Sequence, residues 1–300
     1  MKNKTKIALL GGDLRQYTAA SVLCRGNWEI NVWGLSPSCR DDGINFCSTY
    51  EEAVSDAKAI VLPLPASVDG SYLNCSFADS DKHIRLSDLL AAAQVCRVIV
   101  GGKIPAEFAA NAEAKGIKVA DYFESEEFQI ENAYTTAEAA LSIAMNSLNR
   151  NLSTSRVAVC GYGRISKHLV RLLCALRADV TVAARKESDL AWASSLGCKT
   201  LSIAEGATPG ILSLCRGYDV IYNTVPHWIF GRDFLEKVDK NTFLIDLASV
   251  PGGVDICAAK ELSSNVLWAT SLPGKYAPIS AGELIASCVA TILSEEVRAE

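Results

Sequence analysis

Two glycines, Gly161 and Gly163, separate an apolar run from a helical pattern in the stretch VAVCGYGRISKHLVRLL, residues 157–173. Residues 157–160 have the pattern of a buried strand, and apolar residues after the glycines recur at helical spacing. A strand that turns sharply into a helix offers free backbone N–H groups to phosphate, and glycines let a pyrophosphate approach. The stretch therefore predicts a dinucleotide site, with an ordinary strand-to-helix turn as the alternative. The residues expected to line it are Gly161, Tyr162, Gly163, Arg164 and Ile165.

The next predicted strand, residues 179–184, is followed directly by Arg185 and Lys186. In a site for NAD, an Asp or Glu near this position binds the ribose hydroxyls, whereas an Arg accommodates the 2′-phosphate of NADP. The strand tip has no acidic residue, and Arg164 adds a third cation behind the glycines. The sequence therefore favours NADP over NAD, with a solvated basic turn as the alternative.

The composition narrows the class of protein. A chain of 300 residues with 49% hydrophobic residues can bury two cores, so we expect two domains. A net charge of −5, with no dense basic tract, argues against a nucleic-acid or membrane partner. The eleven cysteines are an odd number without a C-x-x-C pair, which predicts reduced thiols and no metal site. With neither a signal peptide nor an apolar run of bilayer length, we expect a cytoplasmic protein.

Residues 6–121 alternate between strand-like and helix-like segments. Strands are expected at residues 7–10, 30–33, 60–62, 98–100 and around Val119. Five strands with intervening helices predict a doubly wound parallel sheet of the flavodoxin-like kind. We expect this α/β region to form an N-terminal substrate domain, residues 1–134.

A stretch of some twenty residues between Pro65 and Arg85 has no periodicity and is rich in Ser, Asp, Gly and Asn. Loops this long are uncommon in compact domains unless they bind something or are disordered. It follows a predicted strand, at whose carboxyl end open α/β sheets bind ligands. We therefore expect a substrate lid, with a mobile insertion as the alternative.

A long helical pattern covers residues 125–149. Thr135 suits a helix N-cap, and Glu138 lies three residues later, which is the capping-box distance. The pattern predicts a connecting helix over residues 135–151. Capping explains Thr135 and Glu138 as well as catalysis does.

The C-terminal half predicts a second doubly wound parallel sheet. Six strand candidates lie near Val157, Val180, Lys199, Val220, Phe243 and Val266. Six strands with a glycine turn after the first are typical of a Rossmann fold, so we expect an NADP-binding domain over residues 152–300. The residues at strand ends expected to face the nicotinamide are Thr224, Val225, Pro226 and Ala248.

Seven short motifs occur in order along the chain. They are GGD-x-R (11–15), LPLP (62–65), NAYTTAE (132–138), CGYGRIS (160–166), NTVP (223–226), DLASVPGG (246–253) and LPGKYAP (272–278). Together they resemble the family of dipicolinate synthase A subunits over essentially the whole chain. One departure is Ser166, which stands where the nucleotide fingerprint has Gly or Ala, although serine is small enough for close packing.

The resemblance implies a reaction, a partner and a setting. The reaction is NADP-linked oxidation of dihydrodipicolinate, a cyclic imine dicarboxylate of the lysine pathway, to pyridine-2,6-dicarboxylate. The implied partner is a flavoprotein-like B subunit, and the implied setting is the cytoplasm of the mother cell during sporulation. We also expect a homo-oligomer.

Binding two carboxylates calls for cations and backbone N–H groups near predicted strand ends. Arg15, Lys103 and Lys275 are the candidate cations, each with a solvated surface charge as the alternative. Further candidates for substrate binding are Gly12, Asp13, Asn132 and Thr136.

Aromatisation makes the implied reaction favourable, so a strong base is not required. His227, one of three histidines, falls at the end of a predicted strand, and its ordinary pKa suits a general base. A structural histidine beside Trp228 is the alternative. Glu138 and Asn223 complete the candidate catalytic set.

Two other functions fit parts of this pattern. An NADP-dependent dehydrogenase of a 2-hydroxy or shikimate-like acid shares the two-domain logic, but it usually needs a base paired with a carboxylate. A non-catalytic NADP-binding subunit would bind the nucleotide without turnover.

Overall fold

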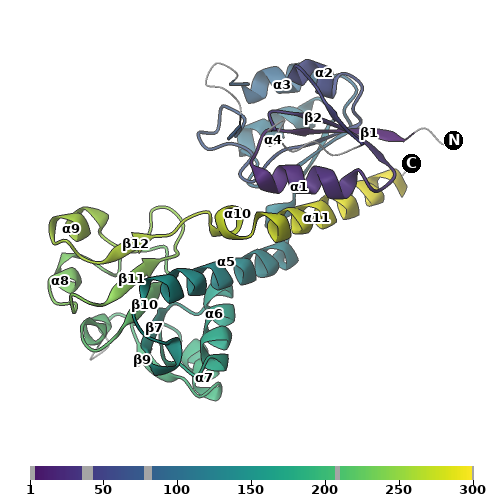
Figure 1. The fold of residues 1–300 in the computed structure, drawn as a ribbon. Helices are drawn as coiled ribbons and strands as arrows, with labels where there is room; N and C mark the ends of the chain where they lie inside the picture. The colour runs from purple at the N-terminus through teal and green to yellow at the C-terminus, as the bar shows by residue number, and fades with distance from the viewer. Residues whose placement is uncertain (1–3, 36–42, 78–82, 207–209, 299–300) are drawn as a thin grey trace. The chain divides into compact units, whose positions relative to one another are not determined.

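The structure, a computed structural model, describes residues 4–35, 43–77, 83–206 and 210–298 (Figure 1). The chain divides into two compact units. Residues 1–132 and 277–300 form the first unit, and residues 133–276 form the second. Each unit contains one parallel sheet of six strands, which confirms the doubly wound α/β class.

The sheet of the first unit has the strand order β3-β2-β1-β4-β5-β6. Its strands are β1 (Thr5–Leu10), β2 (Trp28–Trp33), β3 (Ile44–Phe46), β4 (Ala59–Val61), β5 (Val98–Gly101) and β6 (Lys118–Asp121). The helices around it are α1 (Leu14–Leu23), α2 (Tyr50–Val54), α3 (Leu86–Ala92), α4 (Ala106–Ala114), the short η1 (Tyr122–Glu124) and α11 (Pro278–Arg298).

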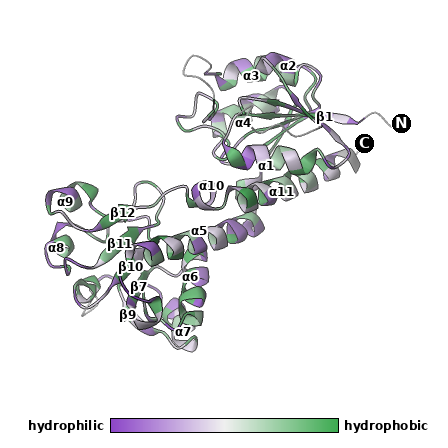
Figure 2. Ribbon diagram, viewed as in Figure 1, coloured by the Kyte–Doolittle hydropathy of each residue, from purple (hydrophilic) through white to green (hydrophobic). Residues whose placement is uncertain are grey.

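Alternating side chains of β1 pack into two separate cores, as the period of a strand requires. Ile7 and Leu9 face a core that includes residues of α1 and α11. Ala8 and Leu10 face the opposite core, which includes residues of α2, α3 and α4. Both faces of the sheet are thus covered, which explains why the strands read as continuous apolar runs. Figure 2 shows this apolar interior in each unit.

The first unit has one strand more than the sequence predicts. β3, residues 44–46, adds a sixth strand beside β2 and changes the order from flavodoxin-like to that of a Rossmann fold. Only Ile44 of its three residues is buried and Asn45 interrupts the apolar run, so the sequence does not reveal this strand. Its pairing with β2 is reinforced by a side-chain hydrogen bond, Asn45 Nδ2 to Asn31 Oδ1 at 3.2 Å.

The last helix, α11, belongs to the first unit, although residues 152–300 were expected to form one domain. Its buried residues Ile285, Val289 and Leu293 share a core with α1 and the first sheet. Gly282 lets the two helices approach closely, because a methyl group there would lie 2.6 Å from the backbone oxygen of Arg15. Burial of this apolar face, which no local pattern assigns to a partner, explains the difference.

The observed helix agrees with the helical pattern over residues 125–149, but it begins before the connecting helix that was expected from residue 135. α5 runs without a break from Glu126 to Ser147, so Thr135 lies inside the helix and does not cap it. The hydroxyl of Ser125 accepts a hydrogen bond from the backbone N–H of Phe128 at the true start. Phe128 is buried in the core of the first unit, and this tertiary contact favours the additional turns.

The sheet of the second unit has the strand order β12-β11-β10-β7-β8-β9, which is the predicted Rossmann arrangement. Its strands are β7 (Arg156–Cys160), β8 (Asp179–Ala184), β9 (Lys199–Ser202), β10 (Val220–Asn223), β11 (Phe243–Asp246) and β12 (Val266–Trp268). The helices around it, besides α5, are η2 (Leu152–Thr154), α6 (Arg164–Ala175), α7 (Glu187–Ser195), η3 (Ile211–Cys215), α8 (Arg232–Leu235), α9 (Ile256–Glu261) and α10 (Leu272–Tyr276).

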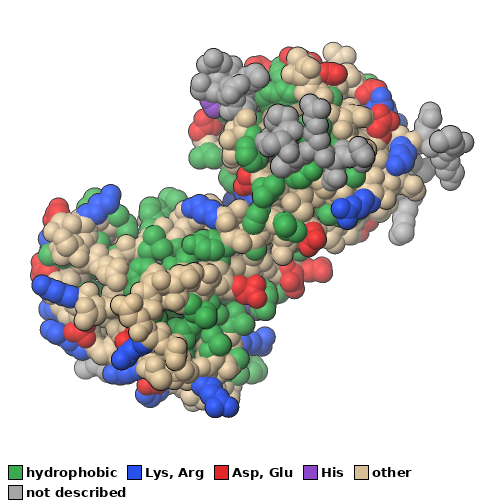
Figure 3. Space-filling view, in the orientation of Figure 1, with side chains coloured by type: hydrophobic (Ala, Val, Ile, Leu, Met, Phe, Trp, Pro, Cys, Tyr) green, Lys and Arg blue, Asp and Glu red, His purple; other side chains and the backbone are tan. Residues whose placement is uncertain are grey.

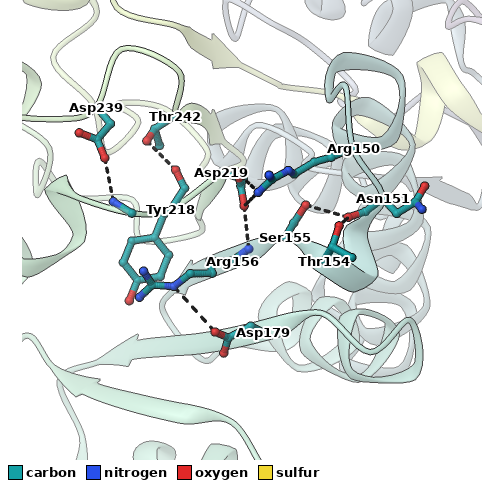
Figure 4. Close-up of polar contacts among 11 residues, drawn as sticks. Arg150, Asn151, Thr154, Ser155, Arg156, Asp179, Tyr218, Asp219, Asp239 and Thr242 are labelled. Carbon is teal, nitrogen blue, oxygen red and sulfur yellow. Dashed lines mark hydrogen bonds and ion pairs between the residues drawn. The ribbon is translucent and has the colours of Figure 1, made fainter.

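A polar network joins the amino ends of strands in the second sheet (Figure 4). Asp219 accepts hydrogen bonds from the backbone N–H of Arg156 at 2.8 Å and from Arg150 Nη1 at 3.0 Å. The Arg156 guanidinium lies over the Tyr218 ring and 3.8 Å from Asp179. These contacts hold β7, β8 and β10 at the edge opposite the glycine turn, so this network stabilises the fold and lies away from the candidate site.

Asp239, in the same region, allows a test of how the stability of the fold depends on pH. The backbone N–H of Gly217 donates to its carboxylate at 2.8 Å, and this bond, together with the Arg216 guanidinium, holds the pKa of Asp239 below its usual value. A lowered pKa means that the carboxylate stabilises the folded state above the ordinary Asp pKa and stops doing so as the pH falls through the lowered value. Thermal melts of Asp239→Asn should show a Tm a few degrees lower at pH 7 and a difference that shrinks below about pH 4.

The matched control is Asp233→Asn, which makes the same chemical change at an exposed position. Its Tm should follow that of the wild type at every pH. A pH-independent deficit in Asp239→Asn would contradict the assigned role of the charge.

The surface and the helices add two general observations. Basic and acidic side chains lie scattered among apolar and polar ones on the face of each unit in view (Figure 3). Within the described residues, the structure contains no helix with the length and apolar character needed to span a bilayer.

Candidate functional site

The turn after β7 has the geometry that the two glycines predict. Gly161 adopts a φ of 92°, a region that L side chains rarely enter. A side chain there would also collide with the Thr224 hydroxyl and approach Val225 Cγ2 at 3.2 Å. The N–H of Gly161 donates to the Ala183 oxygen at 2.8 Å, which ties the turn to the end of β8.

Ser166, the departure from the fingerprint, supports the same turn. Its hydroxyl lies 2.7 Å from the Thr224 hydroxyl, which in turn donates to the Cys160 oxygen at 2.9 Å. Since Thr224 uses its proton on Cys160, Ser166 donates to Thr224. Ser166 is fully buried, so the serine replaces the usual glycine contact with a hydrogen bond between α6 and the end of β10.

The start of α6 leaves room for a phosphate. Gly163 precedes the helix without a side-chain cap, and a Cβ atom there would meet no atom within 4 Å. The first N–H groups of a helix without a cap are free to bind an anion. Tyr162 is nearly buried and Ile165 half-buried, whereas Arg164 is exposed at the helix start. The turn therefore fits a pyrophosphate, which would contact backbone from Gly161 to Ile165.

Arg185 and Lys186 follow β8 at the same edge of the sheet as the glycine turn. Both side chains are exposed, and β8 pairs with β7 in parallel from Arg156 to Cys160. Because parallel strands end at a common edge, the two cations lie where the ribose of a nucleotide at the turn would reach. That these two cations bind a 2′-phosphate stays a prediction.

Asn223 and Asp246 hold the loops that follow β10 and β11. Asn223 Nδ2 donates to Asp246 Oδ1 at 2.8 Å and to the Val225 oxygen at 3.1 Å, and its Oδ1 accepts from Val225 N at 3.0 Å. Asp246 also accepts from the backbone N–H groups of Ala248 and Gly253 at 3.1 and 2.8 Å. Both side chains are fully buried. The contacts favour a positioning role for Asn223 over the catalytic one in the sequence prediction.

This clamp arranges the residues expected to face the nicotinamide. Thr224 and Val225 are half-buried, Pro226 is exposed, and Ala248 is buried with its oxygen bonded to Trp268 Nε1 at 3.0 Å. Asp246 was not among the predicted site residues. Asp246 is the only acidic residue in DLASVPGG, and it stands at the end of an apolar run. This position could have indicated its role.

Three other predicted residues of the second unit are exposed. His227 follows Pro226 in the loop after β10 and makes no hydrogen bond within the described residues. Lys275 lies in the short helix α10 and not directly at a strand end. Glu138 lies on α5 and points to solvent, whereas Thr136, two residues earlier, is buried.

The carboxyl edge of the first sheet brings several predicted substrate residues together. Asp13 caps α1, and Arg15 Nε and Nη2 donate to its carboxylate at 2.9 and 2.7 Å. Arg15 Nη2 also donates to the Leu64 oxygen, beyond the end of β4, at 2.7 Å. The side chain of Arg15 is only 12% exposed, so its guanidinium is held in place and is no mobile surface charge. Arg15 Nη1 makes no hydrogen bond within the described residues.

The loop after Pro65 is anchored beside Gly12, in contrast to a mobile insertion. Gly12 N donates to the Asn74 oxygen at 2.8 Å, and Ser76 N donates to the Gly12 oxygen at 3.1 Å. Asn74 Nδ2 also donates to the Pro65 oxygen at 3.0 Å. The part of the expected lid that lies in residues 66–77 is thus tied to the strand end, and residues 78–82 lie outside the described ones.

Lys103 follows β5 and has a φ of 54°. Asp121, at the end of β6, accepts hydrogen bonds from the backbone N–H groups of Lys103 and Ile104 at 3.1 and 2.8 Å. The ammonium group lies 4.6 Å from the centre of the Phe123 ring, a cation–π contact. Lys103 therefore lies at the predicted edge, but its charge is directed at an aromatic ring. Asn132 is half-buried on α5, one turn before Thr136 and so on the same helix face.

Comparison with known proteins covers both units. A family model described as the N-terminal domain of the dipicolinate synthase A subunit matches residues 6–123. The dipicolinate synthase A subunit of Bacillus subtilis (strain 168) is 28% identical over 293 residues, 97% of this chain and 96% of that protein. The crystal structure of the B. subtilis protein matches with a TM-score of 0.83 and covers 100% of this chain and 99% of that one. The chain is thus similar over its whole length to a dipicolinate synthase A subunit.

A second crystal structure shows the same similarity. The corresponding protein from Bacillus halodurans is 25% identical, with a TM-score of 0.84, and the match covers 98% of this chain and 99% of that one. The resemblance that rested on seven short motifs is thus confirmed. The fold of this chain is also similar to that of a dehydrogenase. A D-lactate dehydrogenase from Treponema pallidum matches this chain with a TM-score of 0.61 at 11% identity, and the match covers 97% of both chains.

Proposed function

We propose that this chain is the NADP-dependent subunit of a dipicolinate synthase. The reaction is dihydrodipicolinate + NADP⁺ → pyridine-2,6-dicarboxylate + NADPH + H⁺. The observation that carries the proposal is the match to the A subunit of dipicolinate synthase over 97% of the chain. The dehydrogenase fold supports hydride transfer, and the setting is the cytoplasm of a spore-forming mother cell, on a branch of the lysine pathway.

The nucleotide would be held by the second unit. Gly161, Gly163 and the start of α6 would bind the pyrophosphate, and Arg185 with Lys186 would bind the 2′-phosphate. The bound nicotinamide would accept a hydride from the substrate ring. Thr224, Val225 and Ala248, held by the Asn223–Asp246 clamp, would position the nicotinamide. Arg164 would add charge beside the phosphates.

The substrate carboxylates would be bound by the first unit. Arg15, fixed by Asp13 and the Leu64 oxygen, has the two N–H groups of Nη1 left to donate to a carboxylate. The backbone at Gly12, together with Asn132, would line the ring, and Lys103 adds positive charge. Thr136 and Lys275, the other predicted substrate residues, belong to the second unit. Orientation of the ring is the main task, because loss of the proton is driven by aromatisation. His227, which lies in an exposed loop, would accept the proton that the substrate ring loses. Glu138 is the other candidate base.

The direct test follows NADPH and the pyridine product together. Purified chain receives NADP and freshly made dihydrodipicolinate, with and without the B subunit of the same synthase. We expect equal amounts of both products, with turnover that depends on the B subunit. Binding of NADPH without any pyridine in either mixture would contradict the proposed reaction.

One alternative is a dehydrogenase of 2-hydroxy acids, whose fold this chain shares. Oxidation of a hydroxyl needs a base that a carboxylate orients. His227 has no carboxylate partner within the described residues, which favours a substrate whose proton leaves easily. The other alternative, a non-catalytic NADP-binding subunit, predicts nucleotide binding without turnover in the same experiment.

A further inference from the structure

Tyr122 is buried at the carboxyl end of β6, and its hydroxyl has no hydrogen-bond partner among the described residues. Only 2% of the residue is exposed. Buried hydroxyl groups in folded proteins are normally paired, because an unpaired one loses its water without compensation. The orphaned hydroxyl therefore indicates a partner that is absent from the chain itself.

Tyr122 lies at the carboxyl edge of the first sheet, where the predicted substrate residues Gly12 and Arg15 also lie. A methyl group on Gly102 would lie 3.0 Å from Tyr122 Cζ and 2.7 Å from Leu64 Cδ1, so the ring packs directly against both residues. The Leu64 oxygen binds Arg15 Nη2, and the charges of Arg15 and Asp13 act on the hydroxyl. The ends of β1, β4, β5 and β6, which are neighbours in the sheet, thus meet around this group.

A second orphaned polar atom lies at the same edge. Gln16, the residue after Arg15, is 1% exposed and donates from Nε2 to the oxygen of Val61, the last residue of β4, at 3.0 Å. Its Oε1 has no partner among the described residues. The edge therefore holds an unused donor, an unused acceptor and a fixed guanidinium.

We propose that the Tyr122 hydroxyl donates a hydrogen bond to a substrate carboxylate bound at Arg15. The inference rests on the proposed function and adds a binding residue to it. Tyr122 would then fix which oxygen of the carboxylate faces Arg15 and so orient the ring. Gln16 Oε1 would accept from the N–H or hydroxyl group of the same ligand.

The buried surroundings of the Tyr122 hydroxyl suit a neutral hydrogen-bond donor. Burial raises the pKa of Tyr122 far above neutrality, so its hydroxyl keeps the proton that it donates. The side chains of Arg15 and Asp13, whose charges act on this hydroxyl, are 12% and 31% exposed. A substrate carboxylate that accepts from Arg15 Nη1 leaves the pairing of Arg15 with Asp13 in place.

The test is Tyr122→Phe in the full chain, with pyridine-2,6-dicarboxylate as the probe in calorimetric titrations. We expect the Kd to rise roughly 10- to 100-fold, because a hydrogen bond to a charged group is lost. We also expect the Tm without ligand to stay the same or rise by about 2–4 °C, because the variant no longer buries an unpaired hydroxyl. Binding and stability thus change in directions that a structural role would not produce.

Tyr222→Phe is the matched control. Tyr222 is also fully buried, but its hydroxyl donates to the Ala140 oxygen at 3.4 Å in the second unit. This control should lose some stability and keep the wild-type Kd. An unchanged Kd in Tyr122→Phe, or a Tm that falls as in the control, would overturn the inference. A wild-type chain that does not bind the probe would overturn the proposed function as well.

Discussion

Arg15→Ala should raise the KM for dihydrodipicolinate by about 100-fold or more, because the variant loses a fixed, charged hydrogen-bond donor to a carboxylate. NADPH affinity should stay within about twofold, since Arg15 belongs to the first unit and the nucleotide turn to the second. Steady-state kinetics with the B subunit and fluorescence titration with NADPH measure the two quantities.

Two further variants sharpen this test of Arg15. Arg15→Lys keeps the charge but loses the planar fork, so its KM should rise by about tenfold. Arg25→Ala removes an exposed arginine beyond the other end of α1 and should leave the KM unchanged. Equal KM values for Arg15→Ala and Arg25→Ala would remove Arg15 from the substrate site.

Arg185→Ala should weaken NADPH binding by roughly 10- to 100-fold and leave NADH binding nearly unchanged, because only NADPH has the 2′-phosphate. The expected result is therefore a loss of discrimination between the two cofactors. Quenching of tryptophan fluorescence by each nucleotide gives both dissociation constants.

The control for Arg185 is Arg177→Ala, which removes an exposed arginine between α6 and the start of β8, at the opposite edge of the sheet. It should bind both nucleotides as the wild type does. If Arg185→Ala weakens NADH and NADPH equally, its charge acts on the shared pyrophosphate and not on the 2′-phosphate. An unchanged NADPH affinity would remove Arg185 from the cofactor site.

The sequence by itself determined the fold class and the nucleotide turn. Both follow from local properties: apolar runs specify buried strands, and the conformation at Gly161 requires a residue without Cβ. The six strands of the second sheet could be placed for this reason. The tip of β8 was likewise predicted with both of its cations.

Only the tertiary structure decided how distant segments combine. The pairing of β3 with β2 and the packing of α11 against α1 each depend on a surface that another part of the chain supplies. The candidate substrate site at the carboxyl edge of the first sheet also depends on tertiary structure, because Arg15, Leu64, Gly102 and Tyr122 follow four different strands. A local pattern reports which residues are apolar, but it cannot report which buried polar atoms remain unpaired, since pairing depends on contacts between residues far apart in the sequence.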